Sequence, residues 1–175
     1  KKSFLSVGGF DMDQLPCEEN LLYYRLLEKN LKLFYSPKIA CHHPSKPIFF
    51  PYARKVLFYA TGRGVLLAKE PNTFHPLFCI PSLFLIILIF VLILSFISKT
   101  ALIILITMIA LYFLLNLIQS FYLFIFFEPN ILIFLVAPIA TFLLHLSYGL
   151  GMLRGYISYK IDRRGTFLMP RYEIK

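Results

Sequence analysis

Charge is missing from three long stretches of this sequence. Residues 77–98, 100–127 and 129–153 contain no Lys, Arg, Asp or Glu. An ordinary soluble domain does not have such stretches, and each is long enough for the roughly 20 apolar residues that cross a bilayer core ~30 Å thick. The mean hydropathy of +0.71 points the same way. We therefore expect transmembrane helices at residues 80–98, 101–127 and 131–152 within an apolar zone at 77–153.

Tryptophan is absent and cysteine is scarce. The aromatic belt at the membrane surface would have to come from the 11 Tyr and 19 Phe residues. Cys17, Cys41 and Cys79 are scattered and form no Cys-x-x-Cys pair. An odd, scattered set of this kind predicts neither a zinc site nor a disulfide framework.

Acidic residues are also few, 9 against 18 Lys and Arg, which gives a net charge of +9. Nucleic-acid binding is the usual explanation for such a charge. Here, however, the basic residues lie before residue 76 or after residue 153, with Lys99 alone between them. Because they flank the apolar stretches, we expect anionic membrane lipids as partners and no nucleic acid.

Residues 1–52 are soluble in character. Pro16, Glu18 and Glu19 are typical of a helix start, and the helix should reach about Asn30. Residues 31–35 alternate apolar and polar side chains like a strand, and residues 38–43 resemble a second short strand. So small a segment cannot build its own core.

Residues 53–76 mix basic and apolar side chains directly before the first apolar stretch. The pattern suits an amphipathic helix on the membrane surface, although an ordinary amphipathic helix fits the pattern almost as well. Gly62 and Gly64 are expected to break it into two pieces. Residues 154–175 form a short basic tail.

Three spans place the basic ends on opposite sides of the membrane, whereas Lys and Arg favour the cytoplasm. Either the third stretch, interrupted by Pro138, is re-entrant or interfacial, or a span outside this chain sets the orientation. Length favours three spans, and the side of the C-terminus stays open. His145 lies in the third stretch, where a hydrogen bond within the bundle would satisfy it.

Residues 3–43 closely resemble the end of the catalytic domain of family-2 glycosyltransferases. The matching residues, in order, are Val7-Gly8-Gly9-Phe10-Asp11, Glu18-Glu19, Leu22, Arg25-Leu26, Lys32, Pro37 and His42-His43. More loosely, YATGRG (59–64) and HLSYGLGMLRG (145–155) are similar to membrane-anchored members that build polysaccharides or glycolipids. The resemblance implies that residues 1–52 are the C-terminal end of an α/β GT-A domain, followed by an interfacial helix and a helical transmembrane bundle.

The resemblance implies an inverting enzyme in which Glu19 is the catalytic base. A carboxylate at a helix start is held in place and kept ionised, ready to accept the proton of an acceptor hydroxyl. Glu18 would position the acceptor or the loop, and Gly8, Gly9 and Asp11 would shape the acceptor loop. A simple helix-capping role for the two glutamates is the alternative. Despite its metal-binding spacing, the Asp11-Met12-Asp13 pair follows a Gly-Gly-Phe turn and resembles a loop anchor.

Arg25 would either anchor its helix through an ion pair or reach the donor diphosphate. Arg54, Lys55 and Arg63 are candidates for diphosphate or lipid-phosphate contacts. The family implies a divalent metal, Mg or Mn, with ligands mostly upstream of this chain. His42 or His43 is a weak candidate ligand, because a structural histidine is the commoner case. The Gln-x-x-Arg-Trp motif of processive relatives is missing, which favours single addition.

We therefore expect the C-terminal part of a membrane-bound glycosyltransferase, inactive by itself, with its catalytic part on the cytoplasmic face of the plasma membrane. It would move a sugar from a nucleotide-sugar donor to a lipid-linked or saccharide acceptor. The alternative is a non-catalytic accessory or scaffold protein that keeps a remnant of the enzyme. A transporter or channel is disfavoured because the spans carry few strongly polar groups.

Overall fold

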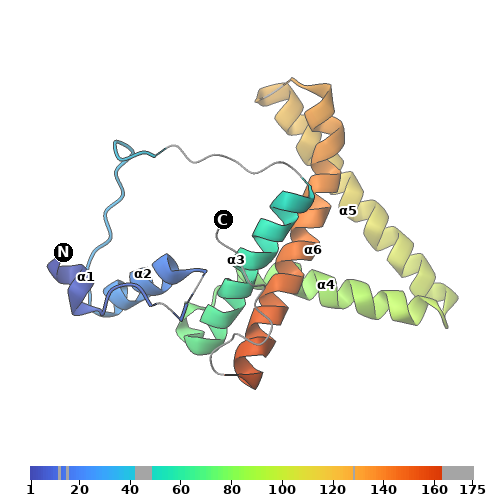
Figure 1. Ribbon diagram of the computed structural model, residues 1–175. Helices are drawn as coiled ribbons and strands as arrows, with labels where there is room; N and C mark the ends of the chain where they lie inside the picture. Colours follow the sequence, from blue (N-terminus) through green and yellow to red (C-terminus); the bar gives the residue numbers. More distant parts are fainter. Residues whose placement is uncertain (12, 15, 42–48, 128, 163–175) are drawn as a thin grey trace.

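The computed structural model describes residues 1–11, 13–14, 16–41, 49–127 and 129–162. Helices are the only regular elements in these residues (Figure 1). Two helices belong to the N-terminal segment, a third links it to the rest, and three long apolar helices follow. Their bounds are α1 Lys2–Ser6, α2 Glu18–Glu28, α3 Phe50–Lys69, the 3-10 helix η1 Pro71–Thr73, α4 Pro76–Ser95, α5 Lys99–Phe126 and α6 Ile131–Ile161.

The expected α/β portion is wrong, because neither expected strand forms in the described residues. Residues 31–35 and 38–41 are irregular, and 42–43 lie outside the described part. Phe34, Tyr35 and Ile39 expose 92%, 84% and 86% of their surface. A strand needs a neighbour to satisfy its backbone groups. No described segment supplies one, so the alternating pattern has nothing to pair with.

Helix α2 begins close to where the acidic residues indicated. Glu18 and Glu19 occupy its first turn, after Cys17 in a left-handed conformation (φ 79°). Leu21 is fully buried and joins Cys17 and Leu66 of α3 in a small core, with Tyr24 packed beside them. The N-terminal segment therefore completes its core by borrowing a face of α3.

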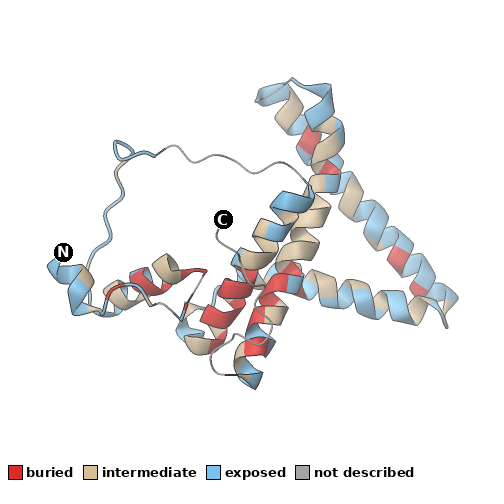
Figure 2. Cartoon of the chain, viewed as in Figure 1, coloured by how far each residue is buried: buried red, intermediate tan, exposed pale blue. Residues whose placement is uncertain are grey.

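Three helices, α4, α5 and α6, are long and apolar enough to cross a membrane. Ser98 and Asn130 cap the second and third of them, since their side chains accept hydrogen bonds from Ala101 and from Leu132 and Ile133. Figure 2 shows that α4 and α5 expose most of their surface, which is largely Ile, Leu and Phe. Such a surface is stable in lipid and not in water. The chain is therefore a membrane protein.

Prolines do not interrupt the membrane helices. Pro81 lies inside α4 and Pro138 inside α6, yet both helices are continuous. A re-entrant third stretch broken at Pro138 is thus not observed. Neighbouring helices allow prolines to be tolerated in membrane helices.

Helix α3 packs along the C-terminal half of α6, and the two run in the same direction (Figures 1 and 2). The expected break at Gly62 and Gly64 is wrong, because α3 is continuous from Phe50 to Lys69. Both glycines instead permit close backbone contacts. A Cβ on Gly62 would overlap the carbonyl of Pro16, and one on Gly64 would overlap that of Met152.

Helix α6 contributes its own small residues to this contact. Gly151 and Gly155 form a Gly-x-x-x-Gly pattern that faces Leu57 and Thr61 of α3. Gly149, two residues before Gly151, lies against Pro81 of α4. Small residues at four-residue spacing let membrane helices approach backbone to backbone, where van der Waals packing holds them together.

Replacing Gly155 by alanine should destabilise the α3–α6 pair. The new methyl group would overlap the Thr61 carbonyl oxygen, which belongs to the backbone and cannot rotate away. We expect a loss of about 1–3 kcal/mol from overpacking, despite the better helix propensity of alanine. Thermal unfolding in detergent, followed by circular dichroism, measures this loss. Ile157→Ala, two residues later at a half-exposed position, is the control, and equal melting of the two variants would contradict the packing argument.

Candidate functional site

The loop before α2 begins with a left-handed glycine turn. Gly8 and Gly9 have φ of 85° and 70°, a region that other residues rarely enter. Their N–H groups donate to the carbonyl oxygens of Leu5 and Phe4. A Cβ on Gly9 would also come within 3.0 Å of the Phe4 ring. The turn thus needs glycine at both positions and directs the chain toward Asp11.

Asp11 joins three parts of the structure. Its Oδ2 accepts from Arg25 of α2 at 2.7 Å and from Lys69 at the end of α3 at 2.8 Å. Its Oδ1 accepts from the N–H of Asp13 at 3.0 Å. The hydrogen bond from Lys69, and then that from Arg25, hold the pKa of Asp11 below its usual value, although partial burial opposes them.

This network leaves Asp11 occupied as an anchor. Arg25 makes the ion pair that was one of its two expected roles, and its donation to Asp11 fixes the loop onto α2. Within the described residues, no three His, Cys, Asp or Glu side chains gather to hold a metal ion. His42 and His43 lie outside the described residues.

Glu18 and Glu19 stand at the positive end of α2. Both are partly exposed, and neither carboxylate makes an ion pair or hydrogen bond in the described part of the chain. They differ in this from Asp11, which accepts hydrogen bonds on both of its carboxylate oxygens. The two glutamates can therefore accept a proton or a hydrogen bond from an outside molecule.

Gln14 and Cys17 fasten the loop to α3, and sequence patterns did not single them out. Gln14 is fully buried, and its Nε2 donates to the carbonyl oxygen of Gly62 at 3.0 Å. The Cys17 thiol lies 3.5 Å from the carbonyl oxygen of Tyr59. No local signal links residues 48 or 42 positions apart. The one feature of the sequence that agrees with these contacts is Gly62, whose carbonyl is accessible because the residue has no side chain.

Burial raises the pKa of the Cys17 thiol to about 11. Arg63 opposes this shift, while Glu19 and Glu18 add to it. The charges of Arg63 and both glutamates therefore act on the same small region around Cys17. Arg63 also lies 4.0 Å from the centre of the Phe78 ring in a cation–π contact.

Cys17 should resist alkylation while Cys41 reacts. Cys17 is buried with a raised pKa, whereas Cys41 is exposed. The lower thiolate fraction alone predicts labelling slower by about 100-fold near pH 7.5. Maleimide labelling of two single-cysteine variants in detergent, one keeping Cys17 and the other Cys41, measures the ratio. Denaturant should restore Cys17 labelling, and equal rates in the native state would show that the loop does not pack on α3.

Lys69→Met should loosen the loop and α2. It removes one of two cations from Asp11, a loss of about 1–2 kcal/mol for a partly buried pair. Hydrogen exchange across residues 7–28 should accelerate by about 5- to 30-fold. Lys32→Met, which removes an exposed lysine, is the control.

The same pair should depend on pH in a defined direction. Since the pKa of Asp11 is lowered in the folded state, its contribution is complete above the unfolded value of about 4 and fades as the pH falls through the folded-state pKa. The difference between wild type and Lys69→Met should shrink in acid. A difference that stays constant down to pH 2 would contradict the ionic contribution.

The remaining candidates lie on α3 and in the bundle. Arg54 and Lys55 stand in the first turns of α3, beside a groove between α3 and α6.

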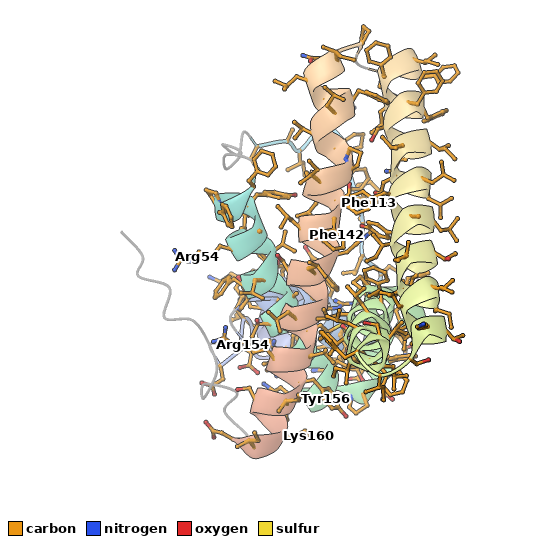
Figure 3. The ribbon with its side chains drawn as sticks, turned by 90° about the vertical axis from the view of Figure 1, so that its right-hand side faces the viewer. Arg54, Phe113, Phe142, Arg154, Tyr156 and Lys160 are labelled. Carbon is orange, nitrogen blue, oxygen red and sulfur yellow. The ribbon has the colours of Figure 1, made fainter. Side chains whose placement is uncertain are left out.

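His145 meets the Tyr112 hydroxyl at 2.8 Å, as expected for a polar group satisfied inside the bundle. Nearby, Phe113 and Phe142 face each other between α5 and α6 (Figure 3). This cluster stabilises the bundle and is distant from the loop site in sequence.

No family model matches the chain, no curated protein matches it, and no solved structure matches it.

Proposed function

We propose that this chain is the C-terminal part of a membrane-bound inverting glycosyltransferase. The enzyme transfers a sugar from a nucleotide-sugar donor to a lipid-linked or saccharide acceptor at the cytoplasmic face of the membrane. The ordered motif from Val7 to His43 supports this reading. The long apolar helices support the membrane setting.

The contrast between the two acidic pairs carries the proposal. Asp11 is neutralised by Arg25 and Lys69, so its role is to anchor the loop to α2 and α3. Glu18 and Glu19 sit a few residues later at a helix start, partly exposed and without a bonded partner among the described residues. A carboxylate held by two cations is poorly placed to take a proton, whereas a general base needs an open lone pair within reach of the hydroxyl. The arrangement therefore favours chemistry at the glutamates.

In the proposed reaction Glu19 accepts the proton of the acceptor hydroxyl. The hydroxyl oxygen attacks the anomeric carbon of the donor, and the bond to the nucleotide diphosphate breaks on the opposite face, so the configuration inverts. Glu19 lies in the first turn of α2, at the positive end of the helix. Glu18 positions the acceptor or the helix start.

The fold explains how such a base is held near the bilayer. Gln14 donates to Gly62, and Asp11 binds Lys69, so the loop is fixed at two points of α3. Helix α3 is in turn packed against α6, which crosses the membrane. The glutamates therefore keep a constant position relative to the bundle, as a lipid-linked acceptor would require.

A divalent metal does not fit the described residues. Asp11 is bonded to two cations, and no group of three suitable ligands is present among these residues. The Mg or Mn expected for the enzyme would need ligands elsewhere, and no step above depends on it.

A non-catalytic accessory protein is the second candidate. It is favoured by one observation, namely that the described residues form only helices and include no α/β portion. In that case the glutamates would act only on the helix dipole.

Glu19→Gln separates the two candidates. In the enzyme that contains this chain, turnover should fall by about 100- to 10,000-fold because the base is lost, while nucleotide-sugar binding is kept. Release of nucleoside diphosphate from a panel of nucleotide sugars, in membranes bearing each variant, measures turnover. Glu18→Gln is the matched control and should cost far less. Unchanged turnover in Glu19→Gln would remove Glu19 as the base, and no turnover in any variant would favour the accessory protein.

A further inference from the structure

A groove lies between the first turns of α3 and the middle of α6. Its volume is about 680 Å³. The wall on α6 belongs to a membrane-crossing helix, and the wall on α3 carries two basic side chains. Its principal lining residues are Arg54, Lys55, Leu57, Leu146, Ser147 and Leu150. The groove thus combines apolar side chains with two neighbouring positive charges.

The positive charge in the groove is not neutralised by the protein. Within the described residues, neither Arg54 nor Lys55 forms an ion pair, and the acidic groups that do so are confined to Asp11. Lys55 lies 5.8 Å from the centre of the Tyr59 ring, a weak contact that leaves its charge in place. Two adjacent, uncompensated cations beside an apolar wall favour an anion from outside the chain.

The other basic candidates are already engaged. Arg25 donates to Asp11, and Arg63 covers the ring of Phe78. The first contact neutralises Arg25, and the second holds the Arg63 guanidinium against α4, outside the groove lining. The phosphate-binding candidates on α3 are thereby narrowed to Arg54 and Lys55.

Arg154 extends the same surface along α6. It follows Leu150 by four residues, so the two lie on one face of the helix. Its Nε atom is buried and has no hydrogen-bond partner in the described part of the structure. Figure 3 shows Arg54 and Arg154 on the same side of the α3–α6 pair, the side turned away from α5. Arg154 does not line the groove itself, but it adds positive charge on the same side of the helix pair.

We propose that this groove binds the phosphate headgroup of a membrane lipid. Arg54 and Lys55 donate to the phosphate oxygens, and the acyl or prenyl chain lies along Leu146 and Leu150 of α6. A soluble phosphate would gain nothing from the apolar wall, whereas a lipid uses both halves of the groove. The site does not depend on the role of Glu19.

Lipid binding is tested on the whole 175-residue chain in phosphatidylcholine nanodiscs. The probe is a fluorescent long-chain alkyl monophosphate, compared with the same alcohol without phosphate and with inorganic phosphate as competitor. Wild type should bind the phosphate at least tenfold more tightly than the alcohol. Arg54→Gln/Lys55→Gln should weaken phosphate binding by about 30-fold, as expected for two lost charges at a lipid surface.

Lys99→Gln/Lys160→Gln is the matched control, since it removes the same charge from positions outside the groove. It should bind the probe like wild type, and circular dichroism should show equal helix content in all variants. Equal binding of alcohol and phosphate would overturn the headgroup site. So would an equal loss in the control pair, which would indicate general surface charge. Displacement of the probe by inorganic phosphate at equal concentration would assign the cations to a soluble anion.

Discussion

The backbone contact between α3 and α6 determines where everything else lies. Gly64 on one helix and Gly151 and Gly155 on the other remove the side chains that would hold the helices apart. The membrane provides no hydrophobic force between helices, so close packing must supply the attraction. Because α6 is long and apolar enough to cross a membrane, its contact gives α3 a fixed place beside the bundle. The N-terminal segment gains its place mainly through α3, with one further hydrogen bond from Asn72 of η1 to the Tyr24 hydroxyl.

This hierarchy explains how a segment without a core of its own can present an ordered site. Leu21 and Cys17 pack on Leu66, which supplies the missing apolar surface. Asp11 and Gln14 then fix the orientation through directed polar contacts to Lys69 and Gly62. Apolar burial supplies the attraction, while the ion pairs and hydrogen bonds select one arrangement. None of these loop contacts involves Glu18 or Glu19, so both carboxylates stay accessible to an outside molecule.

Sequence patterns were strongest where one local rule decides the outcome. Uncharged length located the membrane helices, and acids after a proline located the start of α2 to within two residues. Sequence patterns failed where the structure of a segment depends on contacts with residues far away in the sequence. The alternation at 31–35 is a property of strands only when another strand is present. Gly62 and Gly64 resemble helix breakers until the carbonyls of Pro16 and Met152 are seen against them. Likewise, no local pattern could pair Asp11 with Lys69.

The groove residue Arg54 and the loop contact at Tyr59 lie on different sides of α3. Cys17, next to the glutamates, contacts α3 at Tyr59, five residues after Arg54 of the groove. Five residues correspond to about 140° of rotation and about 8 Å of rise in an α-helix. Lys55, however, the second cation of the groove, is only four residues before Tyr59, about 40° around the helix and about 6 Å along it, and its ammonium group lies 5.8 Å from the centre of the Tyr59 ring. The lipid site and the loop site proposed above therefore adjoin on α3, and the packing of this one helix against α6 supports both.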